Sequence, residues 1–153
     1  MIPIRGLFES HLTVRDLERS MTFYEGTLGL ELAHSVPDRK VAFYWLGRVG
    51  TSMLGLWESG TSPQRLSLHC AFRTDLPALL NAPGQLRAAS VTPLDFWGNP
   101  SDEVTVLAWM PAASVYFHDP DGNLLEFLAM LPDPPRPELG VISWTRWREN
   151  EPA

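Results

Sequence analysis

The chain is poor in cysteine and has no long apolar runs. Its 153 residues include one cysteine, Cys70, so an intrachain disulfide is excluded and a reducing compartment is expected. No apolar run approaches the roughly 20 residues that a membrane helix needs, and the opening sequence MIPIR lacks the apolar segment of a signal peptide. We therefore expect a cytoplasmic protein that does not enter a membrane.

Positive charge is also scarce. Twelve lysines and arginines stand against eighteen aspartates and glutamates, so the net charge is −6 and the pI is near 5.1. Nucleic-acid binding usually shows a basic face, and this composition predicts no nucleic-acid partner. Apolar residues make up 44% of the chain, which is enough for the core of one globular domain or of two small modules.

The first part of the chain has the pattern of a strand, a helix and three further strands. Residues 7–14, LFESHLTV, alternate between an apolar face and a face that carries Glu9 and His11. Asp16 is a typical N-cap for the helix that follows, in which apolar residues recur at helical spacing. Further strands are predicted at 31–35, 41–46 and 52–57.

The same order of elements recurs from residue 66 onward. The sequence LSLHCAF predicts a strand that carries His69, and Asp75 caps a second helix. Strands are expected at 92–96, 112–118 and 124–130, with an insertion at 97–111 and a DPDG turn between the last two. We therefore predict an α+β fold with a first module at 5–62, a second at 63–131, and a proline-rich connector and C-terminal tail at 132–153.

Four ionisable side chains interrupt otherwise apolar strands: Glu9, His11, His69 and Glu126. Burying an ionised carboxylate without a partner is costly, so these strand faces are wet, or the groups are paired, or they bind a metal. Imidazole and carboxylate together suit a divalent first-row metal such as Mn, Fe, Ni or Zn. No short motif joins two of them, and a single histidine or glutamate is more often a hydrogen-bonded or solvated residue than a ligand.

Two stretches resemble the vicinal oxygen chelate superfamily, also called the glyoxalase/bleomycin-resistance/dioxygenase superfamily. HLTVRDLERSMTFYEGTLGLEL is similar to the family's opening strand and helix, and VYFHDPDGNLLEFLAM is similar to its closing hairpin. The resemblance covers roughly residues 5–131. It implies two βαβββ modules that form a curved mixed sheet around a central cavity, and it implies a homodimer.

The resemblance also implies a metal site. His69 matches the ligand histidine that opens the second module, Glu126 matches the ligand glutamate of the last strand, and Glu9 falls at the usual first-strand ligand position. Alternatively His11 is the first-strand ligand and Glu9 is a base. If Glu9 binds the metal, His11 is the candidate catalytic proton acceptor. The implied cofactor is a divalent Mn, Fe, Ni or Zn ion.

One position departs from the family pattern. Gly55 stands where glyoxalase-type isomerases carry a fourth ligand, usually a glutamate, which argues against lactoylglutathione lyase activity and for a three-ligand transferase or dioxygenase site. Met53 and Trp57 share a strand face with Gly55, and Tyr116 corresponds to a substrate-contacting tyrosine of a related enzyme. These three are candidate substrate-binding residues, and their alternative role is core packing.

Two functions follow from these features. The first is a metal-dependent enzyme that binds a small oxygen-bearing substrate on the ion, as a lyase or isomerase, a transferase or a dioxygenase. The second is a non-catalytic dimeric small-molecule-binding protein of the bleomycin-resistance type. The presence of His69 and Glu126 at ligand positions favours the enzyme.

Overall fold

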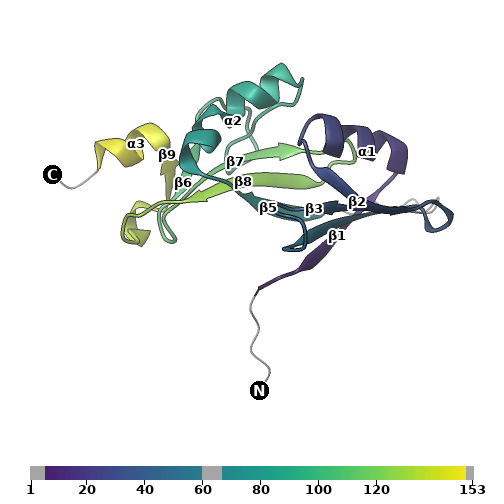
Figure 1. The fold of residues 1–153 in the computed structure, drawn as a ribbon. Coiled ribbons are helices and arrows are strands. Elements are labelled where there is room, and N and C mark those ends of the chain that lie inside the picture. The colour runs from purple at the N-terminus through teal and green to yellow at the C-terminus, as the bar shows by residue number, and fades with distance from the viewer. Residues whose placement is uncertain (1–5, 60–66, 151–153) are drawn as a thin grey trace. The chain divides into compact units, whose positions relative to one another are not determined.

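The computed structural model describes residues 6–59 and 67–150, which divide into two compact units (Figure 1). The first unit takes Met1–Leu68 together with the turn Asp119–Asn123, and the second takes His69–His118 and Leu124–Ala153. None of the helices in the described ranges is long and apolar enough to cross a membrane.

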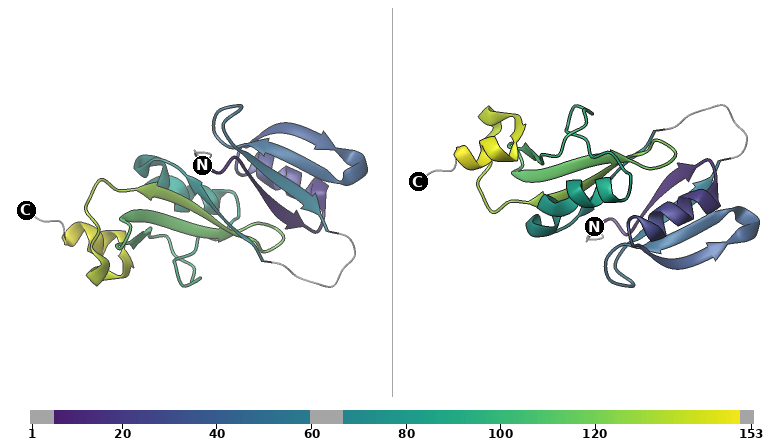
Figure 2. Two further views of the ribbon diagram at one scale, coloured as in Figure 1. Left: turned by 90° about the horizontal axis from the view of Figure 1, so that it is seen from below. Right: turned by 90° about the horizontal axis from the view of Figure 1, so that it is seen from above.

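The first unit is a four-stranded sheet with one α-helix. Figure 2 shows α1 lying across one face of this sheet. The strand order is β1-β4-β3-β2, with β1 parallel to β4 and the other neighbours antiparallel. The elements are β1 (Glu9–Val14), α1 (Leu17–Gly26), β2 (Glu31–Val36), a 3-10 helix at Pro37–Arg39, β3 (Val41–Trp45) and β4 (Met53–Glu58).

The alternation of β1 and β4 gives this sheet one apolar face. Leu12 and Val14 of β1 and Leu54 and Leu56 of β4 are almost completely buried, as is Tyr24 of α1. Successive strand side chains point to opposite sides, so the odd-numbered residues of β1 and β4 are left on the face away from the helix. This is the face that carries Glu9 and His11.

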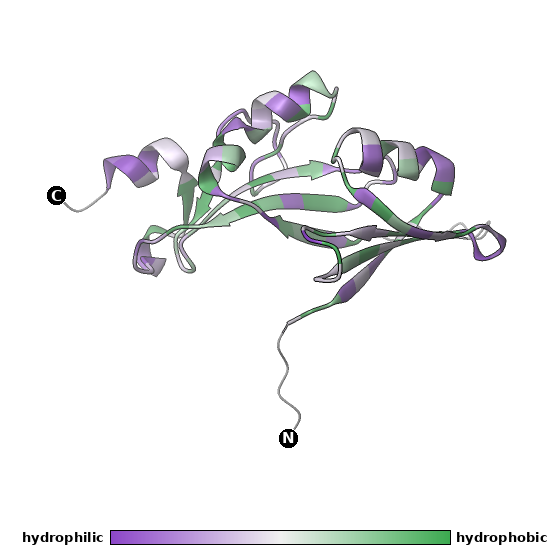
Figure 3. Cartoon of the chain, in the orientation of Figure 1, coloured by the Kyte–Doolittle hydropathy of each residue, from purple (hydrophilic) through white to green (hydrophobic). Residues whose placement is uncertain are grey.

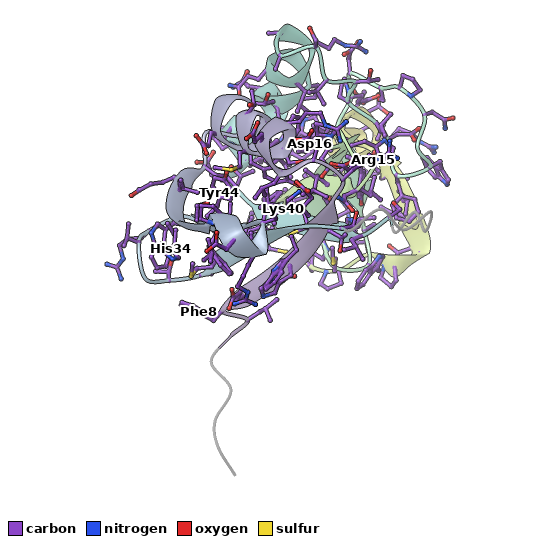
Figure 4. All side chains as sticks on the ribbon, turned by 90° about the vertical axis from the view of Figure 1, so that its right-hand side faces the viewer. Phe8, Arg15, Asp16, His34, Lys40 and Tyr44 are labelled. Carbon is purple, nitrogen blue, oxygen red and sulfur yellow. The ribbon has the colours of Figure 1, made fainter. Side chains whose placement is uncertain are left out.

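The N-terminus of α1 is capped by two carboxylates. Asp16, the predicted N-cap, accepts a hydrogen bond from the Arg19 N–H at 3.0 Å, which confirms that prediction. Glu58 accepts one from the Leu17 N–H at 3.0 Å and a second from the Lys40 ammonium. Asp16 and Lys40 are labelled in Figure 4. These contacts anchor the helix to the end of β4.

The DPDG turn packs inside the first unit, although its flanking strands belong to the second. Asp119 is 5% exposed, and its carboxylate accepts hydrogen bonds from the Tyr24 hydroxyl at 3.0 Å and the Asn123 side-chain amide at 2.8 Å. The backbone N–H groups of Asp121 and Asn123 also donate to it, each at 2.9 Å. Asp121 forms an ion pair with Arg19 at 2.5 Å. Polar side chains of α1 therefore hold this turn.

The second unit is a five-stranded sheet whose order is β5-β8-β7-β6-β9, with β5 parallel to β8. In Figure 3, β7 and β8 are mostly in the green of apolar residues, and α2 contacts both strands. The elements are β5 (His69–Arg73), α2 (Leu76–Ala88), β6 (Thr105–Leu107), β7 (Ala112–His118), β8 (Leu124–Met130), a 3-10 helix at Pro137–Leu139, β9 (Val141–Ser143) and α3 (Trp144–Glu149). The two mixed sheets confirm the predicted α+β class.

The C-terminal segment extends this second sheet. Strand β9 pairs antiparallel with β6, and α3 follows it directly. Trp147 of α3 is fully buried, and the Arg136 guanidinium stacks over its ring at 3.9 Å. The residues predicted as a connector and tail thus include one strand and one helix of the second unit.

The segment at 92–96 is not the regular strand that the sequence predicts. Leu94 makes isolated bridges to Tyr116 and to Pro100. The chain turns at Asp95, whose carboxylate accepts the N–H groups of Trp97 at 2.9 Å and Asn99 at 2.8 Å. An aspartate that bonds the following backbone in this way competes with strand pairing.

Candidate functional site

His69 and Glu126 form a close pair on neighbouring parallel strands of the second unit. His69 opens β5, Glu126 lies in β8, and His69 Nε2 is 3.2 Å from Glu126 Oε2. The side chain of His69 is 48% exposed, whereas that of Glu126 is only 6% exposed. The structure therefore brings together two of the predicted metal ligands, with one of them reachable from solvent.

The atoms of the two side chains that point away from each other, His69 Nδ1 and Glu126 Oε1, are hydrogen-bonded to neighbours. His69 Nδ1 lies 3.1 Å from the Leu124 carbonyl oxygen, which can only accept, so this nitrogen carries the hydrogen. The Ser114 hydroxyl donates to Glu126 Oε1 at 2.5 Å. A ligating histidine commonly gives its other N–H to a backbone carbonyl, and ligating carboxylates are likewise hydrogen-bonded. The two side chains thus have the hydrogen-bond partners that are typical of metal ligands.

The remaining two atoms, His69 Nε2 and Glu126 Oε2, face each other. Neutral His69 has a lone pair on Nε2, and Glu126 Oε2 is an acceptor, so a positive species has to lie with them, either a proton or a metal ion. Two ligand atoms bonded to one ion at about 2.0–2.2 Å lie about 3.0–3.5 Å apart. The observed 3.2 Å between Nε2 and Oε2 fits that spacing.

A third ligand is not gathered with this pair. Within the ranges 6–59 and 67–150, no group of three or more His, Cys, Asp or Glu residues is placed to hold a metal ion. Glu9 belongs to the first unit, and His69 and Glu126 belong to the second. The three-residue set of Glu9, His69 and Glu126 therefore stays a prediction.

Tyr116 borders the pair in the second unit. It lies opposite Glu126 in the β7–β8 register, and its ring centroid is 6.4 Å from that of His69. The residue is 6% exposed, so burial raises the pKa of Tyr116, and the negative charge of Glu126 raises it further. Tyr116 therefore keeps its proton at neutral pH and can donate a hydrogen bond.

Sequence reasoning missed two neighbours of this pair. Ser114 is fully buried and orients Glu126. Phe96 packs edge-on against Tyr116 with 6.1 Å between ring centroids, and it is 47% exposed. Ser114 could have been found, because a polar residue two positions before Tyr116 shares its strand face. Phe96 could not, because its place depends on the turn at Asp95.

Glu9 and His11 lie together in the first unit. They are two residues apart on β1, and His11 Nε2 is 3.4 Å from Glu9 Oε1. The Trp57 indole N–H donates to His11 Nδ1 at 2.5 Å, and both side chains of the Glu9–His11 pair are partly open to solvent. Met53 lies opposite Glu9 in the β1–β4 register. The predicted residues of this unit thus share one face of the sheet.

Gly55 provides the space in which the His11 ring lies. The two residues are register partners, and a Cβ atom on Gly55 would sit 2.6 Å from His11 Nδ1 and 3.3 Å from the Phe43 ring. The backbone of Gly55 does not have a positive φ. Space for the imidazole, and not backbone conformation, is therefore what requires glycine here.

Known proteins share this fold. The family model described as the Glyoxalase/Bleomycin resistance protein/Dioxygenase superfamily matches residues 7–127. An integron cassette protein from the mobile metagenome of the Halifax Harbour sewage outfall is 31% identical to this chain. The match has a TM-score of 0.71 and covers 83% of this chain and 100% of that chain.

Two solved structures at lower identity are similar in fold alone. A lactoylglutathione lyase from Agrobacterium tumefaciens is 21% identical, with a TM-score of 0.63, over 84% of this chain and 96% of that chain. A genomically encoded fosfomycin resistance protein from Listeria monocytogenes is 22% identical, with a TM-score of 0.62, over 85% of this chain and 97% of that chain.

Proposed function

The chain belongs to the glyoxalase/bleomycin resistance protein/dioxygenase superfamily, and on that premise we propose that it is a metal-dependent enzyme acting on a small oxygen-bearing molecule. Members of this superfamily commonly use divalent metals. The observation that carries the proposal is the His69–Glu126 pair, whose facing Nε2 and Oε2 atoms are 3.2 Å apart. The proposed ion is Mn, Fe, Ni or Zn, which imidazole and carboxylate ligands suit.

The site residues of the second unit each have a role in this proposal. His69 and Glu126 hold the ion, while the Leu124 carbonyl and Ser114 keep their ligand atoms in place. When bound, the ion supplies a Lewis acid for the oxygens of the substrate. Tyr116 keeps its proton and donates a hydrogen bond to an oxygen that gains negative charge.

The first unit supplies the remaining residues on the strength of the sequence resemblance. Glu9 is the proposed third ligand, and Met53 and Trp57, with Tyr116 of the second unit, are the proposed substrate-binding residues. His11 was predicted as a catalytic proton acceptor, but its contacts favour a different role, which is argued below. A small-molecule substrate and a homodimer complete the proposal.

The strand registers bear on the type of reaction. In the second unit Glu126 pairs with Ala71, and in the first unit the equivalent register pair is Gly55 with His11. Gly55 is thus the counterpart of the ligand glutamate, and the first unit has no carboxylate there. This supports a transferase or dioxygenase with open metal positions over a lyase or isomerase that needs a fourth carboxylate.

Metal analysis of the purified protein tests the proposal. After loading with Mn, Fe, Ni or Zn in turn, inductively coupled plasma mass spectrometry is expected to give about one equivalent per chain, as for a single site. His69→Ala and Glu126→Ala each remove a ligand and should reduce this to background. His34→Ala, which changes an exposed histidine of β2, is the matched control and should keep the metal.

Two results would contradict the proposal. Full metal content in both ligand variants would mean that the ion binds elsewhere. No metal in the wild-type protein under any loading would leave the non-catalytic binding protein of the bleomycin-resistance type as the better account.

Sedimentation analysis of the same samples tests the homodimer, since a monomer at all concentrations would contradict it.

A further inference from the structure

The Nδ1 atom of His11 is occupied by a partner that can only donate. The indole nitrogen of Trp57 has a hydrogen and no acceptor site, and it lies 2.5 Å from His11 Nδ1. Nδ1 must therefore present its lone pair. In the neutral ring the hydrogen is then on Nε2, which lies 3.4 Å from Glu9 Oε1.

We propose that Trp57 and Gly55 fix His11 as a hydrogen-bond donor that positions the Glu9 carboxylate, so that His11 is neither a metal ligand nor the resting proton acceptor. Metal binding through Nε2 needs a lone pair on that atom, which moves the hydrogen to Nδ1. There it would point at the Trp57 N–H, and two donors would face each other at hydrogen-bond distance. His11 can bind a metal in this way only if it leaves Trp57.

The direction of the Trp57 N–H is itself fixed by packing. The Arg39 guanidinium lies 4.8 Å from the ring centroid of Trp57, within the range of a cation–π interaction. Phe43 packs edge-on against both His11 and Trp57, with ring centroids 6.1 and 6.4 Å apart. The indole therefore cannot turn away from His11 without giving up these contacts.

The absence of a Cβ atom at position 55 is the second requirement. The His11 ring lies where any larger side chain on β4 would stand, with 2.6 Å from the ring nitrogen Nδ1 to the position of such a Cβ. The nitrogen crowded by that Cβ is the one that accepts from Trp57. A methyl group at position 55 would therefore displace the ring and break the same hydrogen bond.

Only one part of this inference rests on the proposed function, namely that the positioned Glu9 is a metal ligand. The choice of tautomer depends on three residues of the first unit and needs no metal. The two parts can therefore fail separately, and each has its own measurement.

The tautomer is measured by long-range ¹H–¹⁵N correlation spectroscopy on the metal-free full chain, at a pH well above the ordinary histidine range of about 6.5. Exposed His34 of β2 serves as the internal reference, because free imidazole already has its own tautomer preference. A hydrogen bond of ordinary strength should favour the Nε2–H form of His11 roughly five-fold beyond the ratio in His34. A ratio equal to that of His34, or an excess of the Nδ1–H form, would overturn the inference.

Two variants separate the hydrogen bond from mere packing. Trp57→Phe keeps an aromatic ring but removes the N–H, and Gly55→Ala keeps the N–H but displaces His11. Both should bring the tautomer ratio of His11 to that of His34, with the amide spectrum showing a folded chain. Trp45→Phe on β3 is the matched control and should leave the ratio unchanged. An unchanged ratio in either folded test variant would mean that Trp57 does not set the tautomer.

The positioning of Glu9 is tested by Mn²⁺ titration calorimetry. His11→Gln keeps an N–H donor and should stay within about three-fold of the wild-type affinity, whereas His11→Leu should lose roughly ten-fold, as for a partner that orients a ligand. Equal affinities in wild type and both variants, or a large loss in both variants, would overturn the positioning role. Failure of the wild type to bind Mn²⁺ would contradict the proposed function and, with it, the ligand role of Glu9, but not the tautomer.

Discussion

The two units use histidine in opposite ways. In the second unit His69 gives its Nδ1–H to the Leu124 carbonyl, and in the proposed function its Nε2 atom shares a metal ion with Glu126. In the first unit His11 receives the Trp57 N–H on Nδ1 and turns an N–H toward Glu9. On these two proposals, the partner of the far nitrogen decides whether a histidine is a ligand or a donor. Residue type and strand position alone do not show this difference.

The small residue at each site also changes strand between the units. In the second unit Ala71 on the first strand is the register partner of Glu126 on the last. In the first unit Gly55 on the last strand leaves room for His11 on the first. Equivalent register positions therefore hold one large polar side chain and one small residue, in reversed order. A repeated fold can change its chemistry by exchanging which strand carries the functional group.

The largest predicted effect concerns the DPDG turn, which belongs to the first unit although its flanking strands belong to the second. Asp119→Ala removes a buried acceptor from Tyr24, from Asn123 and from two backbone N–H groups. Removing this buried acceptor from four donors should cost about 2–4 kcal/mol of unfolding free energy, measured by urea denaturation. Asp38→Ala, at an exposed aspartate, should stay within about 0.5 kcal/mol. Equal losses in both variants would remove the turn from the account.

The packing of His11 on Gly55 predicts a strong coupling in a double-mutant cycle. Gly55→Ala should destabilise the wild type by about 1–3 kcal/mol, because the added methyl overlaps the ring. In a His11→Ala background the same change should be neutral or stabilising, because alanine is the better strand residue. Urea denaturation of the four proteins gives the coupling energy. The same cost in both backgrounds would show that the ring is not in that space.

Ser114 provides a matching test in the second unit. Ser114→Ala removes the hydroxyl that donates to Glu126 Oε1. Mn²⁺ affinity should fall roughly ten-fold, because the carboxylate loses its orienting partner while both ligand atoms remain. Ser35→Ala on β2 is the control in the calorimetric titration. An affinity equal to that of the control would mean that this hydroxyl does not orient the ligand.

The smallest predicted effect is a pH dependence of stability that arises at the start of α1 in the first unit. The hydrogen bond from Lys40 and, after it, the bond from the Leu17 N–H lower the pKa of Glu58. A lowered folded-state pKa contributes stability above the unfolded value of about 4.3, and this contribution is lost as the pH falls through the folded value. Glu58→Gln should therefore lower Tm at pH 7, and the difference should shrink at pH values below about 4.

Glu31→Gln, at an exposed strand residue, is the control for this experiment. Its Tm difference from wild type should be small at every pH. A Glu58→Gln difference that stays constant from neutral to acidic pH would show that the charge of Glu58 does not stabilise the helix start.

Much of the fold followed from local signals in the sequence. The aspartate caps of α1 and α2 were predicted, and the structure confirms them at Asp16 and Asp75. The closeness of His69 and Glu126 followed from the family resemblance, and no local motif would have given it. Strand β9 was not predicted, because three residues are too short for the alternation that identifies a strand.

The chemistry of the first site could not be predicted in the same way. Trp57 and His11 are 46 positions apart in sequence, and their hydrogen bond depends on the β1–β4 register and on the missing Cβ atom of Gly55. The family resemblance assigned Gly55 to a position where glyoxalase-type isomerases have a ligand carboxylate. The missing carboxylate was therefore recognised as a departure from the family pattern. The sequence did not show that the vacant space is filled by the neighbouring histidine.

The central claim is that His69 and Glu126, and not His11, bind a divalent metal. A crystal of the wild-type chain grown with Mn²⁺ and measured for anomalous scattering tests it most directly. The account predicts an anomalous peak about 2.0–2.3 Å from both His69 Nε2 and Glu126 Oε2, with His11 still hydrogen-bonded to Trp57. A peak bonded to His11 Nε2, or an empty site between His69 and Glu126 at saturating Mn²⁺, would contradict it.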